Sequence, residues 1–134
     1  MNVRRSLRGV AVFRVSRDAD VVGIDLGLAG VKFSENYSTQ RYKYYFSLLD
    51  DIIAGVDIPT SGIYHRDYIC YHRRIPILCR VYFSRRSLKV EYVVLATFYP
   101  GLLAKISKML EKAGWKRIFL LEIAVPKPSP WRGV

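Results

Sequence analysis

The sequence contains very little asparagine, glutamine or cysteine, and half as many acidic residues as basic ones. Among 134 residues, the side-chain amides are limited to Asn2, Asn36 and Gln40. Because these amides are thermolabile, their scarcity beside plentiful Arg, Tyr, Val and Ile indicates a thermophilic source. The two cysteines, Cys70 and Cys79, are too few for a secreted disulfide framework or a four-ligand zinc site.

Long apolar runs are also missing. No segment approaches the roughly 20 apolar residues that span a bilayer, and the apolar N-terminal part is interrupted by Arg14 and Arg17 and lacks a cleavage site. We therefore expect a cytoplasmic protein without a membrane partner. The length and the 51% hydrophobic content predict one globular domain at residues 1–125, and three prolines predict an extended arm at 126–134.

The charge is strongly positive. The chain has 22 basic and 11 acidic residues, which give a formal net charge of +11. Such a charge favours a polyanionic partner, of which nucleic acid is the commonest. An acidic protein surface, a ribonucleoprotein neighbour or an anionic membrane is compatible with the same charge.

The hydrophobic pattern predicts an α+β fold. Alternating and β-branched runs predict five or six strands, and apolar residues at helical spacing predict two amphipathic helices. The predicted strands are 10–15, 21–26, 63–72, 77–83, 88–98 and 116–125, and the predicted helices are 41–55 and 101–113. Read from residue 21 onward, this order predicts a single antiparallel sheet with both helices on one face, with a ferredoxin-like topology as one possibility.

One segment resembles a known family. In "YPGLLAKISKMLEKAGW", residues 99–115, a Pro-Gly pair opens a helix and an Ala-Gly turn returns to a strand, which is similar to the start of an ACT domain. The resemblance covers one βαβ unit, and the rest of such a domain would have to follow residue 125. We therefore do not carry over the amino-acid-binding function of that family.

Catalytic motifs are incomplete. His65, Arg66 and Asp67 spell a triplet found in protein kinases, but position 72 is His instead of the required Asn, and no glycine-rich loop precedes it. We predict no catalytic residue, cofactor or metal ligand. A metal-dependent nuclease remains an alternative because acidic ligands can be scattered along a chain. The acidic candidates are Asp25, Glu35, Asp50, Asp51, Asp57, Asp67 and Glu91.

The register of the central hairpin decides which side chains share a face. A three-residue loop at 74–76 pairs Tyr71 with Cys79, so that apolar residues face apolar residues. This register predicts that Cys79 is buried and Cys70 lies on the opposite face, without a disulfide. In the next pair of strands it places Arg80 opposite Glu91.

With this register, one exposed sheet face becomes aromatic and basic. The predicted nucleic-acid-binding residues are Tyr64, Arg66, Tyr68, His72, Arg73, Arg74, Arg80, Tyr82, Arg85, Arg86 and Lys89. The chain termini extend this contact with Arg4, Arg5, Arg8, Lys127, Trp131 and Arg132. Leu78, Val93 and Leu95 on the same face indicate a homodimer or a protein partner.

The combined pattern predicts a small nucleic-acid-binding protein that is not an enzyme and prefers single-stranded DNA or RNA. Tyrosines stack on bases, and arginines bind phosphate or stack in turn. Two alternatives stay open besides a purely structural role for the tyrosines. One is a subunit of a ribonucleoprotein or viral assembly that acts through protein contacts, and the other is the nuclease.

Overall fold

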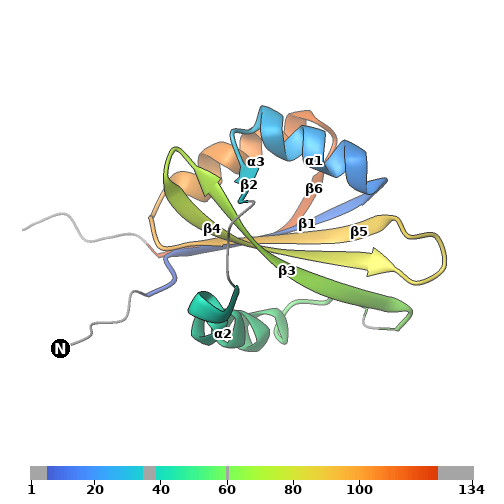
Figure 1. Ribbon diagram of the computed structural model, residues 1–134, viewed down its shortest axis with the longest axis horizontal. Helices are drawn as coiled ribbons and strands as arrows, with labels where there is room; N and C mark the ends of the chain where they lie inside the picture. The colour runs from blue at the N-terminus through green and yellow to red at the C-terminus, as the bar shows by residue number, and fades with distance from the viewer. Residues whose placement is uncertain (1–5, 35–38, 60, 124–134) are drawn as a thin grey trace, which may run out of the picture.

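The computed structural model describes residues 6–34, 39–59 and 61–123, which form one open sheet of six antiparallel strands (Figure 1). The strands are β1 (Gly9–Arg17), β2 (Lys32–Phe33), β3 (Ile63–His72), β4 (Ile75–Ser84), β5 (Val90–Thr97) and β6 (Lys116–Glu122). Their order in the sheet is β2-β3-β4-β5-β1-β6. The predicted α+β class and single antiparallel sheet are confirmed, and the predicted arm at 126–134 lies outside the described residues.

Helices cover both faces of the sheet. The helices are α1 (Ala19–Leu28), α2 (Lys43–Ile53, after a 3-10 turn at Thr39–Tyr42) and α3 (Leu102–Lys112). Figure 1 shows α1 and α3 on one face and α2 on the other. The expectation that both predicted helices share a face is therefore wrong, because α2 and α3 lie on opposite faces. No helix in the described ranges is long and apolar enough to cross a membrane.

The elements β1, α1, β4, β5, α3 and β6 follow the βαββαβ succession of ferredoxin-like folds. The chain from β2 to β3 is inserted between α1 and β4, where it widens the sheet and supplies α2. The predicted strand at 21–26 is wrong, since those residues lie inside α1. The segment that resembles the start of an ACT domain, residues 99–115, contains α3 and the turns that connect it to β5 and β6 in the last βαβ unit.

Two helices end in the same backbone motif. After α1, the N–H groups of Gly30 and Val31 donate to the carbonyls of Gly27 (3.0 Å) and Leu26 (2.8 Å). After α3, Gly114 and Trp115 repeat this pattern with Glu111 (3.0 Å) and Leu110 (3.1 Å). The glycine in each Ala-Gly pair has a positive φ, which completes this Schellman cap. The sequence "LAG" at residues 28–30 therefore signals the end of α1 as clearly as "KAG" at residues 112–114 signals the predicted end of α3.

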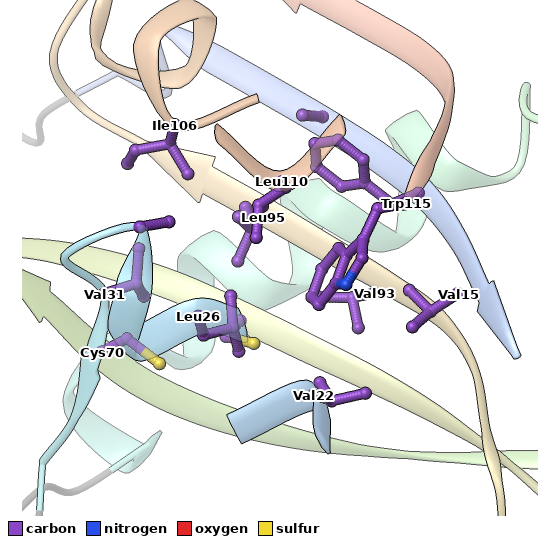
Figure 2. Close-up of a cluster of buried hydrophobic side chains, with 14 of the residues drawn as sticks. Val15, Val22, Leu26, Val31, Cys70, Val93, Leu95, Ile106, Leu110 and Trp115 are labelled. Carbon is purple, nitrogen blue, oxygen red and sulfur yellow. The ribbon is translucent and has the colours of Figure 1, made fainter. Parts of the chain in front are cut away.

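The sheet separates two apolar cores. Figure 2 shows the core beneath α1 and α3, where Trp115 packs among aliphatic side chains from both helices and the sheet. Asp25 on α1 accepts hydrogen bonds from Trp115 Nε1 (2.8 Å) and from Arg17 Nη1 at the end of β1 (2.9 Å). The second core, beneath α2, includes Phe46 and Leu49, as the predicted apolar face of that helix requires. Central strands therefore bury side chains on both faces.

The central hairpin has a different register from the predicted one. Arg73 and Arg74 form a two-residue turn, His72 pairs with Ile75, and Tyr68 pairs with Cys79. Both arginines have positive φ values, 48° and 71°. Such two-residue turns twist in the same sense as the strands, which is why they outcompete a three-residue loop. The loop of residues 74–76 and the pairing of Tyr71 with Cys79 are therefore wrong.

The change of register also moves the cysteines. Cys70 and Cys79 are both buried free thiols in the core beneath α1 and α3, so the prediction of opposite faces is wrong. A hydrogen bond with Cys70, together with burial, raises the pKa of Cys79 well above its ordinary value. Both effects keep Cys79 in its neutral, unreactive form.

The pairing of β4 with β5 is also shifted. Arg80 lies opposite Val94, not Glu91, and Val81 lies opposite Val93. The residues expected on an outer apolar face are all fully buried inside this chain: Leu78, Val93 and Leu95. Leu78 packs beneath α2, whereas Val93 and Leu95 pack beneath α1 and α3. The chain's own helices therefore provide the cover that a partner was expected to provide.

The turn at Arg73 and Arg74 generates a prediction about stability. A left-handed conformation costs a side chain with a Cβ about 1 kcal/mol, whereas Asn and Gly adopt it readily. We expect Arg73→Asn with Arg74→Gly to raise the free energy of unfolding by about 1 kcal/mol, measured by urea denaturation. Arg73→Gln with Arg74→Gln removes the same charge and is the control. Equal stabilisation by both pairs would show that charge, not conformation, is responsible.

Candidate functional site

The eleven predicted binding residues do not share one face. Tyr64, Arg66 and Tyr68 lie on the face of α1 and α3, and Arg80 and Tyr82 lie beneath α2. The others gather at the two hairpin ends: His72, Arg73 and Arg74 at one, and Arg85, Arg86 and Lys89 at the other. The continuous face is wrong because the two-residue turn reverses the orientation of every side chain in β3.

A groove of about 250 Å³ lies between α1 and the strands β2 to β5. We call it the aromatic groove. Its lining residues are Ala19, Val22, Gly23, Phe33, Tyr68, Val81, Phe83 and Val90. The rings of Phe33 and Tyr68 meet edge to face, with centroids 5.3 Å apart and an interplanar angle of 85°. Phe33 keeps 40% of its surface exposed, so this aromatic wall is accessible from solvent.

The aromatic groove continues into a cationic end. Tyr64 stacks on its cross-strand partner Phe83 at a centroid distance of 5.3 Å and an angle of 19°. The guanidinium carbon of Arg85 lies 5.9 Å from the centre of the Tyr64 ring. Arg66 is exposed on the same strand face between Tyr64 and Tyr68, roughly 6.8 Å from each along the strand. The guanidinium group of Arg66 therefore lies between two tyrosine rings on this face of β3.

The helical wall of the groove is made of small side chains. Apart from its chain neighbours and the backbone of its own helix, a Cβ atom placed on Gly23 would have no atom within 4 Å. The opposite wall combines the rings of Phe33, Tyr68 and Phe83 with the side chains of Val81 and Val90. A glycine in a helix interior costs roughly 0.5 to 1 kcal/mol relative to alanine. The absence of a side chain at Gly23 leaves the groove open beside Tyr68.

Arg80, on the opposite face, is 3% exposed and is bound by the protein's own carboxylates. Its Nε and Nη2 donate to the two carboxylate oxygens of Asp67 (2.7 and 3.2 Å), and its Nη1 donates to Asp50 on α2. Burial lowers the pKa of Arg80, but the hydrogen bonds and charges of Asp67 and Asp50 outweigh burial and raise it. Arg80 is therefore a permanent cation that links β3, β4 and α2.

Tyr82 lies beside this ion cluster and is also buried. Burial raises the pKa of Tyr82, although a hydrogen bond from Arg80 opposes the shift. His65 packs against the Tyr82 ring at 5.4 Å. Since Tyr82 is covered, it presents no free ring face for stacking. The predicted binding roles of Arg80 and Tyr82 therefore gain no support from their positions.

A second concave region lies at the turn of the central hairpin. It has a volume of about 560 Å³ and combines cationic and apolar side chains. We call it the basic hollow, with Lys32, His72, Arg73 and Arg74 on one side and Leu28 and Met109 on the other. His72 Nδ1 donates to the Gly30 carbonyl (3.1 Å), so His72 holds the end of α1 against β3.

Sequence reasoning missed Phe33, which makes the aromatic wall together with Tyr68. The strand that carries it has only two residues and pairs with β3 at Tyr71 and Cys70. A strand this short has no recognisable alternation. The only local signal is the preceding Gly30, whose positive φ ends α1 and directs the chain towards β3.

The acidic candidates of the nuclease alternative form no metal-binding group among the described residues, and Glu35 lies outside those residues. In residues 6–34, 39–59 and 61–123, no three His, Cys, Asp or Glu side chains are placed to hold one metal ion. Asp50 and Asp67 bind Arg80, and Asp25 binds Arg17 and Trp115. These three carboxylates therefore have structural partners.

Comparisons with known proteins give no relative: no protein-family model matches the chain, and neither a curated protein nor a solved structure is significantly similar to it.

The ion cluster generates a second prediction. Asp67 makes two hydrogen bonds to Arg80 with a side chain that is 23% exposed, whereas Asp50 makes one and is 60% exposed. Removing a buried charge partner destabilises more than removing an exposed one. We expect Asp67→Asn to lower the free energy of unfolding by about 2 kcal/mol and Asp50→Asn by less than about 1 kcal/mol. Chemical denaturation measures both, and equal losses would contradict the unequal roles.

Proposed function

We propose that the protein binds single-stranded nucleic acid in the aromatic groove. The observation that carries the proposal is the row of Tyr64, Arg66 and Tyr68 on one face of β3, with the stacked Phe83 and the accessible Phe33 beside it. Aromatic rings bind bases of any sequence through their faces, and adjacent guanidinium groups bind the phosphates. The net charge of +11 supports the same class of partner.

The charges around the groove favour one path for the bound strand. Asp18 and Asp20 are exposed at the start of α1 and repel phosphate. Arg66 and Arg85 lie on the sheet side, and Arg86 and Lys89 belong to the same loop as Arg85. The bases would therefore point towards α1 and Tyr68, and the phosphates would follow Arg66 and Arg85. A duplex keeps its bases stacked inside, so this arrangement selects single strands.

The tyrosines provide the direct test. We expect Tyr64→Ala with Tyr68→Ala to weaken binding of a labelled single-stranded oligonucleotide by roughly 1 to 3 kcal/mol for each stacked base that is lost. Fluorescence anisotropy across a salt series measures the affinity, for DNA and RNA and for a duplex. Tyr99→Ala is the matched control, since Tyr99 is 42% exposed and does not line the groove. Unchanged affinity in the double variant would contradict the proposed site.

Gly23 allows the groove to be closed without disturbing the core. We expect Gly23→Leu to abolish single-strand binding because the new side chain occupies the groove, while the helix gains roughly 0.5 to 1 kcal/mol from losing a glycine. Gly27→Leu is the control, because a Cβ on Gly27 also meets no atom within 4 Å but Gly27 does not line the groove. Anisotropy and thermal melting are measured on both variants. Normal binding by a stable Gly23→Leu protein would exclude the groove.

A further inference from the structure

The outward side of α1 is apolar and is left exposed by the part of the chain that the structure describes. Val21, Ile24 and Leu28 follow one another at helical spacing and are 39%, 63% and 73% exposed. Met109 of the neighbouring helix α3 is 50% exposed, and it lines the basic hollow together with Leu28. We call Val21, Ile24, Leu28 and Met109 the apolar stripe.

The apolar stripe contains no basic residue. From Val21 to Leu28 the only charged side chain is Asp25, which is bound to Arg17 and Trp115. In a chain with a net charge of +11, most surfaces of two copies repel each other. The α1 part of the apolar stripe is a surface on which two copies can meet without bringing cations together, whereas the exposed Lys105, Lys108 and Lys112 of α3 lie around Met109 at its margin.

The two ends of α1 have opposite charge. Asp18 and Asp20 are exposed at its start, and the basic hollow with Lys32, Arg73 and Arg74 adjoins its end. Among the described residues, none of these five side chains takes part in an ion pair. Two helices packed antiparallel bring the start of each beside the end of the other, so the two contacts are identical and opposite charges meet at both.

We propose that two copies of this chain form a two-fold symmetric dimer through the apolar stripe, with the two α1 helices antiparallel. Ile24 meets Ile24 near the symmetry axis, Val21 faces Leu28 of the other copy, and Asp20 faces the other copy's basic hollow. The stripe and the aromatic groove occupy different sides of α1, because Gly23 and Ile24 are successive helical positions about 100° apart. The dimer therefore does not depend on the proposed nucleic-acid function.

Sedimentation equilibrium of the full chain, at several concentrations and without nucleic acid, tests the proposal. We expect a monomer–dimer equilibrium that Ile24→Glu weakens roughly tenfold or more, because each copy would bury a charge. Ile118→Glu is the control, since Ile118 is 37% exposed on β6, which lies at one edge of the sheet. A monomer at every concentration would overturn the proposal. So would a dimer that only Ile118→Glu disrupts, since β6 would then form the interface.

A charge exchange tests the antiparallel arrangement. Asp20→Lys and Lys32→Asp should each weaken the dimer about fivefold, since each change affects two symmetric contacts at the exposed rim. The double variant should recover part of the loss, because the new lysine and the new aspartate attract each other across the interface, while Arg73 and Arg74 of the hollow stay cationic. Additive loss in the double variant would overturn the arrangement. Thermal melting of each variant shows that the fold is intact.

Crosslinking gives an independent readout that does not require weakened binding. Cys70 and Cys79 are fully buried, so a cysteine introduced at Ile24 is the reactive thiol among the described residues. We expect Ile24→Cys to be joined to the second copy by a short bismaleimide, and Ile118→Cys to remain monomeric. Crosslinking at position 118 and not at 24 would refute the proposal.

Discussion

The turn at Arg73 and Arg74 is the constraint on which the positions of the proposed binding side chains depend. Two residues in left-handed conformations pair His72 with Ile75, and this pairing determines the register of the whole hairpin. A three-residue loop would move every side chain of β3 to the other face. The turn therefore places Tyr68 beside α1, and it leaves Arg80 beneath α2. Neither arginine is a preferred residue for such a turn, so the matching of the two apolar cores must outweigh the conformational cost.

Covering the sheet on both faces has a consequence for charge. Central strands that bury both faces have no room for unpaired cations, so the excess positive charge lies mainly at hairpin ends, helix surfaces and edges. Arg80 is the exception, and it is bound by two carboxylates from different elements. The same argument explains why the predicted exposed face does not exist. An aromatic and basic surface can form only where helical cover stops, which is along β3 near the start of α1.

The sequence predicted the two amphipathic helices and the extent of the central strands, and it failed at α1, which is apolar on its outward side as well, and in the strand register, where pairing is non-local. The amphipathic helices α2 and α3 were predicted within a few residues, because one face of each is apolar and the other polar. Residues 21–26 were predicted as a strand because α1 lacks such a pattern. The predicted register was wrong because either set of alternate residues in β3 can face a given side of the sheet. Matching apolar residues of β3 with those of β4 favoured the wrong set. The sequence placed three residues of the candidate site on one face: Tyr64, Arg66 and Tyr68. It could not predict that Phe33 joins them.

The missing pattern of α1 follows from the number of surfaces that this helix serves. Val22 and Leu26 point into the core and Gly23 lines the aromatic groove, while Ile24 and Leu28 face outward. In a helix with a single buried face, apolar residues recur every three to four positions and polar residues lie between them. The helix α1 lacks this pattern because its outward side is apolar as well. An exposed Ile and Leu on a free surface oppose solubility, whereas the same residues in a dimer are buried. The apolar composition of α1 therefore prevents its recognition as an amphipathic helix. A helix requires this same composition if its three sides face a core, a ligand groove and a second copy of the chain.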